Sequence, residues 1–123
     1  MKIEVSNGEL VDKLSILEIK LNKIRDSKKL KNIRKEYSLL EKAVGLIIKR
    51  DDPLYRQLLD INQKLWEIED RIRELEKKKD FGSEFIETAR MVYFNNDIRA
   101  KIKQEINLKT NSDLFEEKSY EDY

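Results

Sequence analysis

Leucine and isoleucine recur three and four positions apart over long stretches of this sequence. Between residues 53 and 79 the pattern holds at seven positions: Leu54, Leu58, Ile61, Leu65, Ile68, Ile72 and Leu75. Residues three and four apart lie on one side of an α-helix, so this spacing predicts a long amphipathic helix with one apolar seam. At 1.5 Å per residue the helix is about 40 Å long. Its seam needs a partner helix of similar length to exclude water.

Shorter seams of the same kind precede this segment, and a less regular apolar pattern follows it. We therefore predict an all-α fold in a single domain, residues 1–123. The predicted elements are helices over 6–26, 27–50, 53–79 and 83–108, followed by an acidic tail over 109–123. Because the links are short, we expect an antiparallel helical bundle with a long coiled-coil-like helical hairpin. The second and third helices are the expected partners in that hairpin.

Three places in the sequence indicate where helices begin or break. Ser6 and Glu9 have the spacing of a capping box, in which the hydroxyl caps the first turn and the carboxylate reaches back. Asp52 followed by Pro53 is a favoured helix start. The run Asn95–Asp97 indicates a kink or a new cap within the fourth helix.

Composition restricts the chemistry that this chain can carry. Charged residues make up 41% of it, but the net charge is only +1, so no global field attracts nucleic acid or anionic lipid. The absence of cysteine and histidine removes thiol nucleophiles, the commonest general base and the commonest zinc ligand. No apolar run approaches the roughly 20 residues that a membrane span needs. We expect a soluble, cytoplasmic protein with no cofactor, no metal, no nucleic-acid partner and no membrane partner.

The seams are longer than a small bundle needs, which favours completion of the core by a second subunit. We expect a homo-oligomer, a dimer or higher, and binding to another protein is the alternative. The segment Ala43–Ile48 is apolar on every face and is expected to be buried on all sides. Trp66 flanks the third seam, as large aromatic residues at interfaces do. The candidate interface residues are Trp66, Leu46 and Ile48, with packing inside one chain as the alternative for Trp66.

The segment from Arg90 to Arg99 is the part of the chain that packing explains least. It combines two arginines, which can bind a carboxylate or phosphate bidentately, with aromatic and amide side chains. Carboxylates of the first helix are expected on the opposite wall. The candidate ligand-binding residues are Asp12, Glu18, Arg90, Tyr93, Asn96 and Arg99. The simpler alternative is a kinked helix with local capping and a solvated polar stripe.

The basic stretch 28–35 and the acidic tail are oppositely charged, so one interpretation is that they contact each other.

Three sequence blocks resemble a known family: VSNGELVDKLSILEIK, LWEIEDRIRELE and YFNNDIRAKIKQEINLKTNSDLFEEKSY. The family comprises small uncharacterised helical proteins of bacteria and phages, and is defined as a domain of unknown function. Some members carry it beside tetratricopeptide or glycan-related modules. The resemblance covers nearly the whole chain and implies no catalytic residue. It points to the first helix and to residues 93–107 as the places to look for function.

These observations favour a self-associating structural or protein-interaction module. The alternative is a small enzyme or binding protein for an anionic metabolite, a phosphate or a sugar phosphate. The lack of catalytic side chains weighs against an enzyme without excluding one.

Overall fold

The apolar seams fold as helices, and the predicted all-α class is confirmed. The computed structural model describes residues 1–123 and contains no strand. Its four helices are α1 (Asn7–Lys23), α2 (Ser27–Gly45), α3 (Pro53–Lys77) and α4 (Ser83–Lys109). None of the four is apolar over a stretch long enough to cross a bilayer. The tail beyond α4 has no regular secondary structure.

Two of the predicted helix starts are confirmed by their caps. The Ser6 Oγ accepts a hydrogen bond from the Glu9 amide at 3.1 Å, and the Asp52 carboxylate accepts one from the Leu54 amide at 2.9 Å. These bonds satisfy amide groups that the first turn of a helix leaves without a partner. The other half of the capping box is not formed, because the Glu9 carboxylate binds a lysine of α4 instead.

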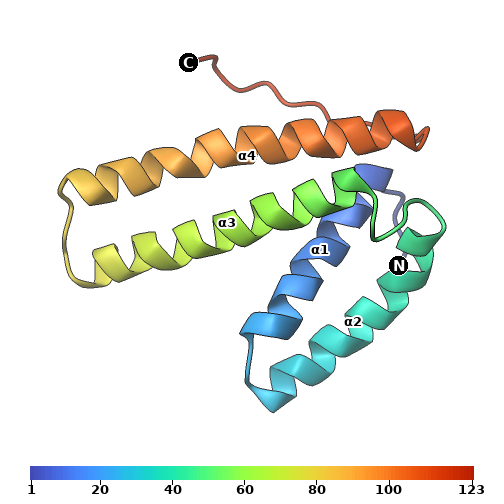
Figure 1. The fold of residues 1–123 in the computed structure, drawn as a ribbon, viewed down its shortest axis with the longest axis horizontal. Coiled ribbons are helices and arrows are strands. Elements are labelled where there is room, and N and C mark those ends of the chain that lie inside the picture. The colour runs from blue at the N-terminus through green and yellow to red at the C-terminus, as the bar shows by residue number, and fades with distance from the viewer.

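The helices form two antiparallel hairpins, α1–α2 and α3–α4, which cross each other steeply (Figure 1). Helix α1 packs against all three other helices, whereas α2 packs against α1 alone. The predicted hairpin of the second and third helices is therefore wrong, and the long hairpin is α3–α4. The link of residues 46–52 turns the chain away from the direction of α2. As a result, the first turns of α3 cross α1. Periodicity identified each seam but carried no information about which seam would face it.

The core lies where the two hairpins cross, and all four helices contribute to it. Its nine buried residues are Val11, Leu14, Val44, Ile48, Tyr55, Leu58, Ile61, Ile102 and Ile106. Burying one such side chain fully contributes about 1.5–3 kcal/mol. The expectation that Ala43–Ile48 is buried on all sides is wrong, because α2 ends at Gly45 and Leu46 is 91% exposed in the turn that follows.

Helix α4 runs without a break over 27 residues, so the predicted kink at Asn95–Asp97 does not occur. The buried Asn95 side chain donates to the Met91 carbonyl at 2.7 Å, one turn back, and its amide is accommodated within the helix. The far half of the α3–α4 hairpin extends beyond α1 and α2 (Figure 1). We call residues 64–90 the distal hairpin.

Candidate functional site

The beginning of α1 lies directly against the last turns of α4. The Gly8 amide donates a buried hydrogen bond to Asn107 Oδ1 at 2.6 Å. A Cβ at Gly8 would lie 2.5 Å from the Lys103 carbonyl oxygen, so only glycine allows this approach. The neighbouring Asn7 donates through its backbone to Ser112 Oγ at 2.9 Å. The Ser-Asn-Gly sequence therefore both starts α1 and docks it on α4.

One turn further along α1, Asp12 forms the centre of a buried polar network. It is 2% exposed, and the Arg99 guanidinium of α4 binds it bidentately, through Nε at 2.9 Å and through Nη2. From α3, Asn62 Nδ2 donates to Asp12 Oδ1 and to Ser15 Oγ, both at 2.8 Å. The hydrogen bonds that Arg99 donates to Asp12 raise the pKa of Arg99 above its ordinary value, although burial lowers it. The network thus ties three helices together at one carboxylate.

Beside this network, Lys103 bridges α1 and the tail. Its ammonium group lies 2.7 Å from a Glu9 carboxylate oxygen and 3.4 Å from one of Glu116, and its side chain is mostly buried. The ion pairs with Lys118 and Lys103 lower the pKa of Glu116 to about 2. The carboxylates of Glu9 and Asp12, which have the spacing of a cation site, are thus bound by Lys103 and Arg99 instead.

A second polar network lies further along α1, where this helix packs against α2 and α3. Glu18 of α1 accepts hydrogen bonds from Tyr55 Oη at 2.8 Å and from Arg50 Nη2 at 2.9 Å, and Arg50 Nη1 donates to Tyr37 Oη at 2.6 Å. The Arg50 guanidinium also lies 5.1 Å from the centroid of the Tyr55 ring. Burial, followed by the hydrogen bond with Glu18, raises the pKa of Tyr55. Sequence reasoning missed this network because Arg50 comes from a turn, where no periodicity marks its direction.

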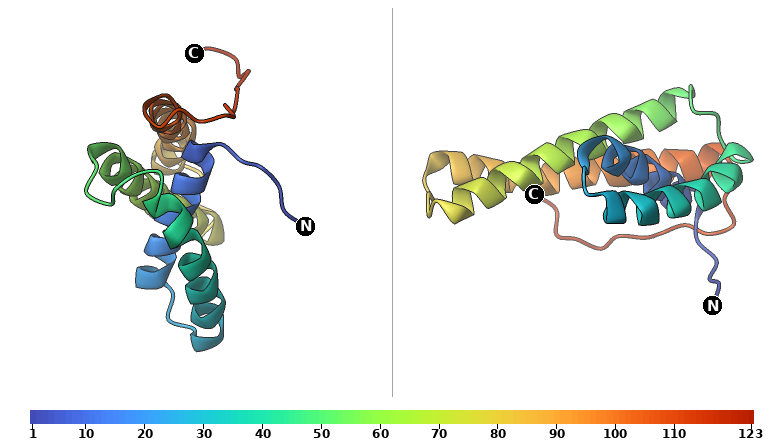
Figure 2. Two further views of the ribbon diagram at one scale, coloured as in Figure 1. Left: turned by 90° about the vertical axis from the view of Figure 1, so that its right-hand side faces the viewer. Right: turned by 90° about the horizontal axis from the view of Figure 1, so that it is seen from below.

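A groove of about 940 Å³ lies between α4 and the acidic tail. Figure 2 shows the tail running back beside α4 toward the middle of that helix. The Tyr123 ring lies 5.3 Å from the ring of Tyr93 and 5.0 Å from that of Phe94, and its hydroxyl donates to Asp97. The interpretation that the tail meets the basic stretch 28–35 is therefore wrong, because its ionic partner is Lys103 on α4.

The structure brings some of the predicted ligand-binding residues together and separates others. Tyr93, Asn96 and Arg99 line the groove, and Asp12 lies behind it, paired with Arg99. Arg90 lies outside, with its guanidinium 5.7 Å from the Phe94 ring, and Glu18 belongs to the second network. Sequence reasoning missed Lys103 and Asn62. Lys103 follows Arg99 by one helical turn, which was the one signal available for it.

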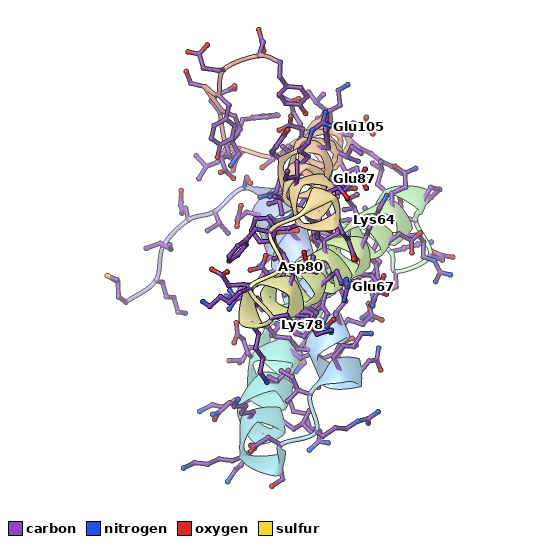
Figure 3. All side chains as sticks on the ribbon, turned by 90° about the vertical axis from the view of Figure 1, so that its left-hand side faces the viewer. Lys64, Glu67, Lys78, Asp80, Glu87 and Glu105 are labelled. Carbon is purple, nitrogen blue, oxygen red and sulfur yellow. The ribbon has the colours of Figure 1, made fainter.

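The candidate interface residues also separate. Ile48 is 6% exposed and belongs to the core of its own chain, so it offers no interface surface, whereas Leu46 is fully available in its turn. Trp66 is partly buried on the distal hairpin. Figure 3, which looks along this hairpin, shows Lys64, Glu67 and Glu87 on the side away from the tail. The partly buried apolar residues of the distal hairpin are Leu65, Trp66, Ile68, Ile72, Phe85 and Ala89.

Comparison with protein-family models matches residues 1–123 to a family described as "Family of unknown function (DUF6165)". The match covers the whole chain, so this protein belongs to that family. Neither a search of curated proteins nor a search of solved structures gave a match.

Proposed function

We propose that this member of a family of unknown function is a self-associating protein-interaction module, in which two copies join through the distal hairpin. The surface concerned, which we call the distal face, consists of Leu65, Trp66 and Ile72 of α3 with Phe85 and Ala89 of α4. The observation that carries the proposal is that this face continues the surface covered by α1, and that each of its side chains stays partly exposed within its own chain.

Helical periodicity supports the continuity of the two surfaces on α3. Asn62 contacts Asp12 of α1, and Leu65 and Trp66 follow it by three and four positions on the same side of the helix. Ile72 follows Leu65 by seven, which is two turns.

The same continuity holds on α4. Arg99 and Lys103 contact α1, and Phe85 and Ala89 precede them by fourteen positions, close to four full turns. The α1 surface therefore runs on toward the α3–α4 loop after α1 itself has diverged.

A second copy is the partner that charge and geometry favour. The distal hairpin carries seven basic and eight acidic residues, so two copies do not repel each other and no strongly charged partner is selected. The charged residues Lys64, Glu67 and Glu87 lie on the side of the hairpin away from the tail (Figure 3). Two helical hairpins that stack by their apolar faces form a four-helix bundle, and a two-fold axis makes each distal face the partner of the other.

The single tryptophan of the chain provides a direct test. Trp66 emission is expected to shift to longer wavelength on dilution, as the distal faces separate and water reaches the indole. Light scattering should give twice 14.8 kDa at the concentrated end of the same series. A mass of one chain throughout, with emission independent of concentration, would refute self-association.

A pair of charge substitutions locates the interface. Ile72→Glu places a carboxylate on the distal face and is expected to give the mass of a single chain with unchanged far-UV circular dichroism. Leu46→Glu, at an exposed position in the α2–α3 turn, should leave the dimer intact. The opposite outcome, in which Leu46→Glu alone abolishes the dimer, would place the interface at that turn and overturn the proposal.

The alternative expected from the sequence, binding of an anionic phosphate or sugar-phosphate metabolite, has less support. The Arg99 guanidinium that would bind such a group is already held bidentately by Asp12, and Arg90 lies outside the groove.

A further inference from the structure

The tail lies over α4 in an extended conformation and contacts it at two places. Near its beginning, the Glu116 carboxylate pairs with Lys103 at 3.4 Å. Seven residues later, Tyr123 packs on Tyr93 and donates to Asp97. Along α4 the two places are separated by up to ten residues, or about 15 Å of helix. Seven extended residues reach up to about 23 Å, so the tail spans the distance with slack.

Few interactions hold the tail in this position. Residues 113–123 form no backbone–backbone hydrogen bond with any part of the chain. The large apolar and aromatic side chains of the tail are all exposed, at 42% or more. Segments with exposed side chains and no backbone pairing open at a low free-energy cost, so the tail can leave α4 without unfolding the helices.

The tail is also a poor electrostatic match for the groove that it covers. Five carboxylates line the groove, and four of them belong to the tail: Glu116, Glu117, Glu121 and Asp122. The fifth is Asp97 of α4. Meanwhile Lys101 of α4 lines the groove and forms no ion pair. Lys101 is therefore left without an anionic partner while the tail occupies the groove.

We propose that the α4 groove is a binding site for an extended acidic peptide segment of another protein, one that carries a tyrosine or similar aromatic residue, and that the tail is a displaceable occupant of this site. A partner peptide repeats the contacts of Glu116 and Tyr123 and adds a carboxylate for Lys101. Aromatic stacking on Tyr93 and ion pairing with Lys103 select its chemistry. This site lies on a different part of α4 from the distal face and does not depend on self-association.

The test uses a fluorescent synthetic peptide with the sequence of residues 113–123, DLFEEKSYEDY, and full-length chains. In the wild type, the attached tail competes at an effective concentration in the millimolar range, so the peptide binds weakly. A full-length released variant, Glu116→Lys with Tyr123→Ala, loses both tail contacts. Fluorescence anisotropy is expected to show at least about tenfold tighter peptide binding to this variant.

Two substitutions on α4, made in the released variant, distinguish specific binding in the groove from nonspecific binding of the peptide. Tyr93→Ala removes the aromatic platform and is expected to weaken peptide binding about tenfold, a loss within the usual range for a stacked aromatic contact. Ile98→Ala is the matched control, because Ile98 is similarly exposed on α4, at 48% against 43% for Tyr93, but does not line the groove. It should leave binding unchanged.

Several results would overturn the proposal. One is peptide binding to the released variant that is no tighter than to the wild type, and another is equal loss from Tyr93→Ala and Ile98→Ala. Equal binding of a peptide of the same composition in scrambled order would show charge attraction without a site. If the wild type has the mass of a dimer in solution and the released variant has the mass of a single chain, the occupant is the tail of a second copy and no other protein is needed.

Discussion

Replacing Gly8 by alanine sets two physical effects against each other, and the structure decides which one wins. In an ordinary helix the change is favourable by up to about 1 kcal/mol, because alanine loses less conformational entropy than glycine. Here the new Cβ would lie 2.5 Å from the Lys103 carbonyl oxygen and 2.9 Å from Asn107 Oδ1. The first of these atoms belongs to the backbone in the last turns of α4 and cannot rotate away.

The helices must therefore separate at this point, and the cost follows from what they lose. Overpacking of a close contact costs about 1–3 kcal/mol. The Gly8 to Asn107 hydrogen bond is buried, and leaving its groups unpaired costs about 1–3 kcal/mol more. After the gain in helix propensity is subtracted, Gly8→Ala is expected to lower the free energy of unfolding by about 1–5 kcal/mol.

Urea unfolding followed by far-UV circular dichroism measures this difference, with all variants at one protein concentration because association would shift the midpoint. Gly45→Ala is the matched control, since a Cβ there meets no atom within 4 Å. It is expected to be neutral or stabilising by up to about 1 kcal/mol. A Gly8→Ala variant as stable as the wild type would refute the close approach of α1 to α4.

Three further substitutions test the buried polar groups. Asp12→Asn leaves the Arg99 charge without its carboxylate and should cost about 3 kcal/mol, whereas the double variant with Arg99→Met should cost less than the sum of the singles in urea unfolding. Additive losses would contradict the pair. Because Tyr55 has a raised pKa in the folded protein, its contribution to stability is complete below about pH 10 and is lost at higher pH, so Tyr55→Phe should flatten the alkaline fall in melting temperature. An equal fall in both proteins would show that Glu18 does not hold a protonated Tyr55. The Asn95 Oδ1 atom is buried without a hydrogen-bond partner, and Asn95→Leu should raise the urea midpoint by the equivalent of about 1 kcal/mol; a lower midpoint would mean that the acceptor is satisfied.

The candidate site shows where sequence reasoning reached and where it stopped. Tyr93, Asn96 and Arg99 were singled out because their segment looked poorly explained by packing, and they do line one groove. Arg90 was grouped with them by proximity in sequence, but its position on the helix turns it toward Phe94. Asp12 or Glu18 was expected opposite these residues, and it is Asp12 that pairs with Arg99.

The features that were predicted correctly depend on residues close together in the sequence. Apolar residues repeat every three or four positions because one side of each helix is buried away from water. Caps such as those of Ser6 and Asp52 are made within a single helical turn. Both can be read without knowing the rest of the chain. The continuity of α4 could not, because the Asn95 side chain donates to the Met91 carbonyl of its own helix, and a sequence does not show which hydrogen bonds form.

The amino-acid sequence by itself determined the helical class, the helix starts and the apolar stripe of each helix, because these depend on neighbours a few positions away. Only the tertiary structure decided that α1 faces α3, that Asp12 meets Arg99 across 87 positions, and that the tail covers α4. The reason is that any apolar stripe can exclude water against any other. The choice among them depends on the direction of the link 46–52, on the close approach that Gly8 permits and on the pairing of charges once they are buried.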